Sequence, residues 1–260
     1  MSTKKVTLKK ERGIGIIVID NPPLNVMGRQ VQEELSEIVE QIKDDNEVVC
    51  VILVTAGEKA FIAGADIKEF PAMMGNPNMQ EYVMGMHNLL HEIDDLPKPT
   101  IAVLDGLTYG GGCELALAFD MRVAEEQTTI ALPEIKLGLF PGGGGTQRLP
   151  RLIGEARSKE MMFTGEPISA EKAEQIGLVN HVVPTGKGLE AAFQIADRIV
   201  DKSLQALSRI KTAVDEGLEL PLREGIKREA QLFEEVFQTK DIAEGVSAFI
   251  EKRKPKFTHQ

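Results

Sequence analysis

DGLTYGGGCELALAFD, residues 105–120, connects an apolar β-branched run to an apolar helix-forming run through three consecutive glycines. The run TIAVLDG (100–106) is typical of a buried strand, and CELALAF is typical of a buried helix. Three glycines let the backbone adopt positive φ or pass very close to another group. The helix that follows directs free N–H groups and its positive end at the same place. This arrangement favours an oxygen that gains negative charge, whereas a tight strand–helix turn without a ligand is the alternative.

A similar turn follows a neighbouring apolar run. AFIAGADIKEF (60–70) comes directly after VVCVILVT (48–55), which is typical of a strand covered on both faces. The small residues 63–65 permit close approach, and Asp66 is suited to hold the turn through its own backbone. Two such turns from adjacent parallel strands can each direct one N–H at the same carbonyl oxygen. We therefore expect the two turns to lie together.

Two acidic residues adjoin these turns. Glu114 falls in the first turn of the apolar helix, where the helix dipole favours a carboxylate. Glu134 follows Pro133 at a strand end, in the third glycine-rich stretch LPEIKLGLFPGGGGTQRL (132–149). An ordinary first-turn acid and a solvated loop acid are the alternatives. Two carboxyl groups in one dry pocket would have separated pKa values, one suited to accept a proton and one to donate it.

Several other chemistries do not fit the sequence. Gly106 and Gly111 have the outer spacing of a phosphate loop, but Gly112-Cys113 stand where Lys and Ser/Thr are needed. No GxGxxG follows the first strand, and the GxSxG of a serine hydrolase is absent. His87 and His91 are spaced i, i+4 on a helix, but HNLLH lacks the intervening Glu of a metalloprotease and no third ligand is obvious. We therefore predict no metal site.

Composition limits the class of protein. The 260 residues are 42% apolar, enough for one large domain or for one domain with an appendage. A net charge of −10 argues against nucleic-acid binding, because phosphate contacts need a basic surface. No apolar run approaches the roughly 20 residues of a membrane span, and no apolar stretch typical of a signal peptide follows the N-terminus. The two cysteines, Cys50 and Cys113, form no CxxC pair. We expect a cytoplasmic protein without disulfides, membrane contacts or nucleic-acid partners.

Two regions differ in their periodicity. Helical stripes over 28–43 and 82–93 alternate with apolar strand-like runs up to about residue 190, which predicts an α/β body over 1–190. The remaining part, 191–260, is helical in pattern with no convincing strand. It is too thin to bury its own apolar faces, so it should pack on the body or on another subunit. The expected strands are 14–20, 48–55, 100–105, MRVAEE and TTIALPE.

The three glycine-rich stretches together resemble the enoyl-CoA hydratase/isomerase (crotonase) family. The likeness covers nearly the whole chain in order. The matching residues are Ala60-Phe61-x-Ala63-Gly64-Ala65-Asp66-Ile67-Lys68, Gly110-Gly111-Gly112-Cys113-Glu114-Leu115, Pro133-Glu134-Ile135, Pro141, Gly144-Gly145-Thr146-Gln147-Arg148-Leu149, Thr164-Gly165, Gly177-Leu178-Val179 and Ser247-Ala248-Phe249-Ile250-Glu251-Lys252-Arg253.

The resemblance implies a crotonase-like spiral of ββα repeats with a helical C-terminal region that makes trimers, which commonly pair into hexamers. It also implies that the N–H groups of Ala65 and Gly111 form an oxyanion hole, and that Glu114 and Glu134 are catalytic. No separate cofactor is implied, because coenzyme A is part of the substrate. The substrate-binding residues that the resemblance implies are Ala63, Ala65, Asp66, Ile67, Lys68 and Gly111.

Both glutamates together favour a lyase that hydrates 2-enoyl-CoA to 3-hydroxyacyl-CoA in fatty-acid degradation. Family members that shift a double bond generally manage with one acid. One alternative is another acyl-CoA reaction on this scaffold, either isomerisation or dehydration of a 3-hydroxyacyl-CoA in butyrate or branched-chain metabolism. A second alternative, from another class, is a non-catalytic member that binds RNA or protein; the intact pair of acids and the net acidity count against it.

Overall fold

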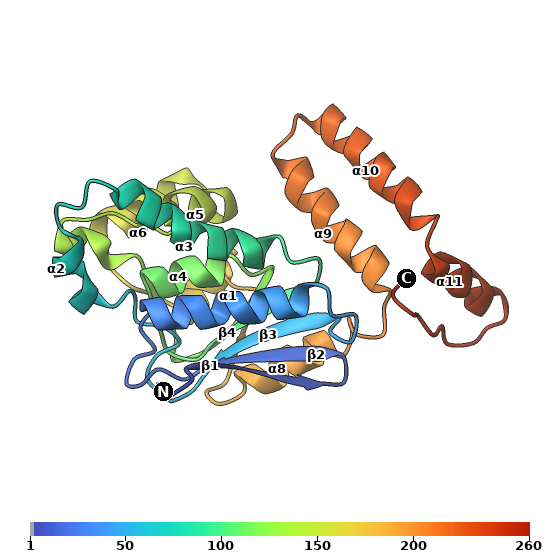
Figure 1. The fold of residues 1–260 in the computed structure, drawn as a ribbon, viewed down its shortest axis with the longest axis horizontal. Helices are drawn as coiled ribbons and strands as arrows, with labels where there is room; N and C mark the ends of the chain where they lie inside the picture. The colour runs from blue at the N-terminus through green and yellow to red at the C-terminus, as the bar shows by residue number, and fades with distance from the viewer. Residues whose placement is uncertain (1–2) are drawn as a thin grey trace.

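A six-stranded sheet forms the centre of the molecule (Figure 1). The computed structural model describes residues 3–260. All neighbours in this sheet are parallel except the first pair, which is an antiparallel hairpin. In spatial order its strands are β1 (Val6–Glu11), β2 (Ile14–Ile19), β3 (Cys50–Thr55), β4 (Thr100–Leu104), β6 (Met121–Glu125) and β9 (His181–Val183).

A second, three-stranded sheet contains β5 (Leu107–Tyr109), β7 (Thr129–Ala131) and β8 (Ile168–Ser169). The chain passes repeatedly between the two sheets. It runs from β4 to β5, through helix α4 (Gly111–Leu117), and then from β6 to β7. Each passage is a ββα turn, and successive turns stack because β4 pairs with β6 while β5 pairs with β7. The predicted α/β body therefore has the order of a ββα spiral.

All five expected strands are present, with shifted ends. Val48 and Val49 are buried but precede β3, and the TTIALPE strand is reduced to β7 because Pro133 begins a 3₁₀ helix, η2 (Pro133–Leu137). Four strands, β1, β5, β8 and β9, were not expected. β1 has an exposed, charged sequence, VTLKKE, and β5 occupies the short interval between the buried strand and the glycines.

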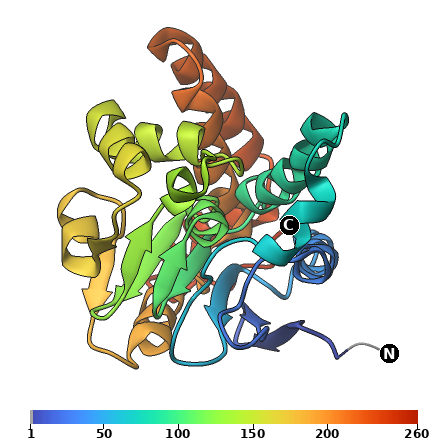
Figure 2. The ribbon, with the colours of Figure 1, turned by 90° about the vertical axis from the view of Figure 1, so that its left-hand side faces the viewer.

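The central strands are buried on both faces, as their continuous apolar sequence predicts. Val51 and Leu53 of β3 face helices α1 (Arg29–Lys43) and α3 (Met79–Asp94), whereas Cys50 and Ile52 face α8 (Gly188–Ala196). Alternation along a strand places neighbouring side chains on opposite faces. Figure 2 shows α1 and α8 on opposite sides of the large sheet. Cys50 and Cys113 are both buried and free.

Four shorter helices and one 3₁₀ helix complete the body. None of the helices within residues 3–260 is long and apolar enough to cross a membrane. The elements are η1 (Ile67–Glu69), α2 (Phe70–Met73), α5 (Gly145–Ile153), α6 (Glu155–Thr164) and α7 (Ala170–Gln175).

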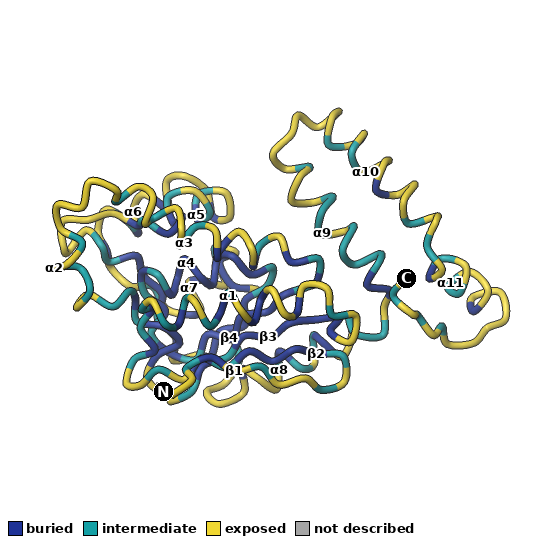
Figure 3. The backbone as a smooth tube through the Cα atoms, in the orientation of Figure 1, coloured by how far each residue is buried: buried dark blue, intermediate teal, exposed yellow. Residues whose placement is uncertain are grey.

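The last three helices extend away from the body (Figure 1). They are α9 (Leu204–Leu218), α10 (Leu222–Val236) and α11 (Lys240–Ile250), and α9 packs along α10. Large apolar side chains on them are open to solvent: Leu218 is 80% and Phe249 86% exposed. Figure 3 shows that most of this part is only partly buried or exposed. The predicted helical C-terminal region is confirmed. A boundary at residue 190 stays a prediction, because α8 crosses it and packs on the sheet.

Helix α4 lies against the backbone of the loop that follows β3. A Cβ on Gly112 would lie 2.7 Å from the Ile62 Cβ and closer still to the Ile62 carbonyl oxygen. Since real Cβ atoms do not approach other atoms so closely, only glycine fits at this position without a shift of the helix or the loop. Gly112 therefore sets the separation between the two turns.

We predict that Gly112→Ala destabilises the protein by about 1–3 kcal/mol, because the added methyl group forces α4 and the loop apart. Gly85→Ala is the matched control, since Gly85 is also a helical glycine but has no atom within 4 Å of the added Cβ. That substitution should leave stability equal or raise it by up to about 1 kcal/mol. Urea unfolding measures both, and equal stabilities for the two variants would contradict the close contact.

Candidate active site

The two glycine-rich turns meet beside helix α4. β3 and β4 are parallel neighbours, so the segments after them begin at the same edge of the sheet. The loop after β3 then pairs with β5: the Ile62 N–H donates to the Leu107 carbonyl oxygen (3.1 Å), and the Tyr109 N–H donates to the Ile62 carbonyl oxygen (2.9 Å). A Cβ on Gly111 would lie 3.7 Å from the Ala65 nitrogen. The expected juxtaposition of the turns is therefore present.

Two backbone N–H groups at this junction lack partners. Among residues 3–260, the structure gives no acceptor to the N–H of Ala65 or of Gly111. Gly111 is the first residue of α4, where an N–H cannot bond within the helix. Gly110, directly before it, has φ of 51° and donates its N–H to the Ala131 carbonyl oxygen (3.0 Å). Unpaired backbone donors that converge in this way can bind one oxygen of a ligand.

Glu114 lies in the first turn of α4 and is 3% exposed. Its Oε1 accepts hydrogen bonds from the N–H groups of Gly143 (2.7 Å) and Gly145 (2.9 Å). Burial raises the pKa of this carboxyl group, and the two hydrogen bonds and the charge of Arg148 oppose that rise without cancelling it. The two N–H groups also leave Oε2 free to face a reactant, since both bonds go to one oxygen.

Glu134 lies in η2, which follows β7 of the three-stranded sheet, and its side chain approaches the same junction. A Cβ on Gly110 would lie 2.9 Å from its Oε1, and its Oε2 is buried without a hydrogen-bond partner. Burial raises its pKa from the ordinary 4.5 to about 7; its own N–H opposes this rise, and the charge of Glu114 adds to it. At neutral pH this carboxyl group is therefore divided between an acid form and a base form.

The predicted substrate-binding residues follow the Ala65 turn. Asp66 holds this turn as expected, because its Oδ1 accepts the Lys68 N–H (3.1 Å). Ile67 is 56% exposed in η1, so its side chain lies at the surface beside the junction. The Ala63 N–H donates to the Leu24 carbonyl oxygen (3.1 Å), which anchors the loop. The structure contains no ligand, and the binding roles of these residues stay predictions.

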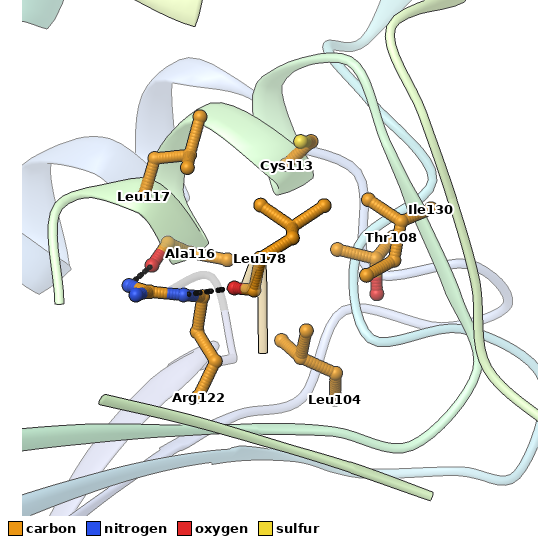
Figure 4. Close-up of a pocket in the computed structure, with 8 residues that line it drawn as sticks. All are labelled: Leu104, Thr108, Cys113, Ala116, Leu117, Arg122, Ile130 and Leu178. Carbon is orange, nitrogen blue, oxygen red and sulfur yellow. Dashed lines mark hydrogen bonds between the residues drawn. The ribbon is translucent and has the colours of Figure 1, made fainter. Parts of the chain in front are cut away.

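Behind α4 the packing is close (Figure 4). Arg122 is buried there and donates from its guanidinium to the carbonyl oxygens of Ala116 (3.2 Å), Phe119 (2.6 Å) and Leu178 (2.7 Å), which satisfies the C-terminal end of the helix. The void beside it, about 10 Å³, is no larger than one water molecule. The space behind α4 therefore supports the helix and does not hold a substrate. The residues that line this void are Leu104, Thr108, Cys113, Ala116, Leu117, Arg122, Ile130 and Leu178.

Sequence reasoning missed the residues that hold Glu114. Gly143 and Gly145 donate to it, and Arg148 lies behind them on α5. The sequence signal for these residues is the PGGGG run followed by TQR, which belongs to the family resemblance but does not by itself predict a contact with Glu114. His87 and His91, in contrast, have ring centroids 6.4 Å apart on α3. Within the described part of the chain no group of three or more His, Cys, Asp or Glu side chains is placed to hold a metal ion.

Comparisons with known proteins agree with this geometry. A sequence model described as enoyl-CoA hydratase/isomerase matches residues 9–260. The short-chain-enoyl-CoA hydratase of Clostridium acetobutylicum is 37% identical over 98% of this chain and 97% of its own. The crotonyl-CoA hydratase of Syntrophomonas wolfei is 36% identical over 99% of each chain. The crystal structure of an enoyl-CoA hydratase from Bacillus anthracis superposes with a TM-score of 0.93 at 39% identity, over 98% of this chain and all of that one.

An α/β spiral with two carboxyl groups beside paired backbone donors defines an acyl-transfer or enolate-forming type of site. The chain belongs to the enoyl-CoA hydratase/isomerase family. The predicted family and the predicted crotonase-like fold are therefore confirmed. The relatives are hydratases by name and thus lyases, the class of enzyme predicted for this chain.

The raised pKa of Glu134 predicts a pH-dependent gain of stability in Glu134→Gln. The pKa of the carboxyl group is near 4.5 in the unfolded chain and raised to about 7 in the folded one, so the contribution of Glu134 to stability falls as the pH rises between these values and is constant above 7. The Glu134→Gln substitution removes this loss of stability, because the side chain no longer ionises. At pH 8 we expect a gain of about 1–2 kcal/mol, allowing for solvent screening of a partly exposed group, and a smaller gain near pH 4.5.

Urea unfolding at pH 5 and pH 8 measures this difference. Glu166→Gln is the control, because Glu166 is an exposed carboxylate paired only with Lys136 at 2.9 Å. It should show no comparable change between the two pH values. The same gain for Glu134→Gln at both pH values would contradict the raised pKa.

Proposed function

We propose that this chain catalyses the addition of water to 2-enoyl-CoA, giving 3-hydroxyacyl-CoA. The observation that supports this proposal most is the proximity of two N–H groups without partners among residues 3–260, Ala65 and Gly111, to two carboxyl groups of raised pKa, the buried Glu114 and the partly buried Glu134. Relatives named as short-chain and crotonyl-CoA hydratases support the same reaction. The physiological setting that we propose is fatty-acid degradation, and the cytoplasm stays the predicted compartment.

The paired N–H groups act on the thioester carbonyl. In the proposed complex the Ala65 and Gly111 N–H groups donate to the carbonyl oxygen of the substrate. This draws electron density from the conjugated double bond, so the β-carbon becomes electrophilic. As water adds, negative charge collects on the carbonyl oxygen, and donors already in place stabilise it without reorganising. Such donors are typically worth about 3–4 kcal/mol of activation free energy each.

The two glutamates supply and remove protons. Glu114 as a carboxylate accepts a proton from the attacking water, and the water oxygen bonds to the β-carbon. Glu134 in its protonated form then donates a proton to the α-carbon, which collapses the enolate to the thioester. The sum is addition of one water molecule, after which Glu114 is protonated and Glu134 is ionised. Exchange with solvent restores both groups.

No separate cofactor takes part in the proposed reaction, since coenzyme A belongs to the substrate and the protons come from water. The residues that we propose to line the coenzyme A path are Ala63, Ala65, Asp66, Ile67, Lys68 and Gly111. Their position supports this role, because η1 continues directly from the Ala65 turn and is open at the surface.

The exposed apolar residues of α9–α11 support self-association of the chain. Leu218, Leu222, Phe249 and Ile250 are each at least 72% exposed on these helices. Large apolar side chains exposed to this extent are typical of a protein interface. We propose that these helices join copies of the chain into the trimer, or the hexamer of paired trimers, that the resemblance implies.

The decisive assay is the loss of conjugated-thioester absorbance when the purified chain meets crotonyl-CoA. We predict a fast loss that chelators do not affect. Glu114→Gln and Glu134→Gln should each reduce kcat by about 10²–10⁴-fold, because each removes one proton transfer, while both variants stay folded. Near-parent rates in either variant would remove that residue from the mechanism.

The alternatives give different results in the same experiment. No absorbance loss from a folded chain that binds acyl-CoA, with conversion of a 3-enoyl-CoA to the conjugated isomer, would favour the isomerase. Absence of both activities together with tight RNA binding at physiological salt would favour the non-catalytic member. Either result would contradict the hydratase proposal.

To test the assembly, we predict that size-exclusion chromatography with light scattering gives the parent protein the mass of three or six chains. Phe249→Asp should shift it toward the monomer, because a charge would be buried in the interface. Lys9→Asp is the control, since the Lys9 side chain is 70% exposed on β1, far from α11 in the fold. A monomeric parent protein would contradict the proposed interface.

A further inference from the structure

We infer that Arg148 is a positioning residue, which locks the Gly143–Gly145 loop against Glu114 and keeps that carboxylate ready to accept a proton. The inference rests on the proposed hydration, because it assigns Glu114 the role of base. Arg148 does not touch the junction of Ala65 and Gly111. It acts through the loop that holds the carboxylate.

The contacts of Arg148 connect the donor loop to a second helix. A Cβ on Gly144 would lie 2.6 Å from Arg148 Nη1, so the guanidinium rests directly against the middle of the loop. On its other side, Nη2 lies 3.3 Å from His91 Nδ1 and 3.2 Å from Asp94 Oδ2 on α3. The Arg148 N–H also donates to the Gly144 carbonyl oxygen (2.8 Å). One side chain therefore clamps the loop between α5 and α3.

The conformation of this loop depends on glycine. Gly143 and Gly145 use their N–H groups on Glu114 Oε1, and Gly144 between them has φ of 100°, which side-chain-bearing residues rarely adopt. A rotation of Gly144 would remove both donors from the carboxylate at once. The planar, multiply donating guanidinium is suited to prevent this because it contacts the loop and α3 at fixed angles.

Arg148 is not optimised for stability alone. The side chain is 15% exposed, and its Nε is buried without a hydrogen-bond partner. No residue within 3–260 accepts from this Nε, and a buried, unpaired donor destabilises a folded protein. A residue that keeps such a donor is better explained by what its charge does for Glu114 than by the packing of α5.

The charge of Arg148 acts on Glu114 in a definite direction. It lowers the pKa of Glu114 against the larger effect of burial. Removing it should raise that pKa further, so the acid limb of activity, where the base form of Glu114 is lost, should move to higher pH. The other titratable or charged groups on the elements packed around Glu114 include Cys113 on α4, Arg122 on β6, Glu134 on η2, Arg151 on α5, and His87, His91 and Asp94 on α3.

The test is a titration of Glu114 by NMR with glutamate labelled at the carboxyl carbon, in which loss of one resonance in Glu114→Gln makes the assignment. In Arg148→Gln we expect the midpoint of Glu114 to rise by about one pH unit, as for loss of a nearby opposite charge. The midpoint of the acid limb in the pH profile of kcat for crotonyl-CoA should move to higher pH by the same interval. At the optimum, kcat should fall about tenfold with KM nearly unchanged, because the loop acts on the base and not on binding.

Arg148→Lys separates charge from shape. It keeps the positive charge, so the Glu114 midpoint should stay near the parent value, but an ammonium group cannot contact Gly144, His91 and Asp94 together, so kcat should still fall several-fold. Arg151→Gln is the matched control. Arg151 is on the same helix, has a side chain 59% exposed and pairs with Glu219, so parent values are expected for all measurements.

An unchanged Glu114 midpoint in Arg148→Gln overturns the inference, as does parent kcat in Arg148→Lys. The lysine variant decides the question if the glutamine variant does not fold. A parent protein without hydratase activity would contradict the proposed function instead, and the NMR titration would still show whether Arg148 controls Glu114.

Discussion

The contact between helix α4 and the Ile62 backbone is the constraint on which the candidate site depends. A methyl group at Gly112 would overlap the Ile62 carbonyl oxygen, so α4 begins as close to the loop as a backbone can approach. That closeness brings the N–H groups of Ala65 and Gly111 to one point. It also fixes where Glu114 projects, since this residue follows Gly112 by half a turn. Arg122 at the other end of α4 stabilises the same placement.

The candidate site combines groups that each destabilise the folded chain. Glu114 is buried and Glu134 partly buried, and burial is the first cause of the raised pKa of both. The N–H groups of Ala65 and Gly111 have no acceptor among residues 3–260, so each lacks a hydrogen bond that the fold could have supplied. Natural proteins depart from optimal packing and hydrogen bonding mainly at their functional sites. The body tolerates these groups because β3 and β4 are covered on both faces by helices.

Residues with a local signature could be predicted from the sequence. The apolar run at 48–55 and the first-turn acid Glu114 are properties of neighbouring residues, so pattern and resemblance located them. β1 could not be predicted in this way, because five of its six residues are at least partly exposed and its apolar alternation is limited to Val6 and Leu8 before a charged run. Arg148 stands out in the sequence only as part of a motif. Its partner Asp94 lies 54 residues away, and only the folded chain brings the two together.

Both thiols of the chain lie inside the body. Burial raises the pKa of Cys50 to about 12 and that of Cys113, beside Glu114, further still. The thiolate is the form that peroxides and alkylating reagents attack, so neither cysteine is reactive at neutral pH. Oxidative damage instead begins at thioether sulfur, and Met74, 78% exposed after α2, is open to it. An enzyme of this build therefore tolerates changes in cellular redox state that would inactivate one with a catalytic cysteine.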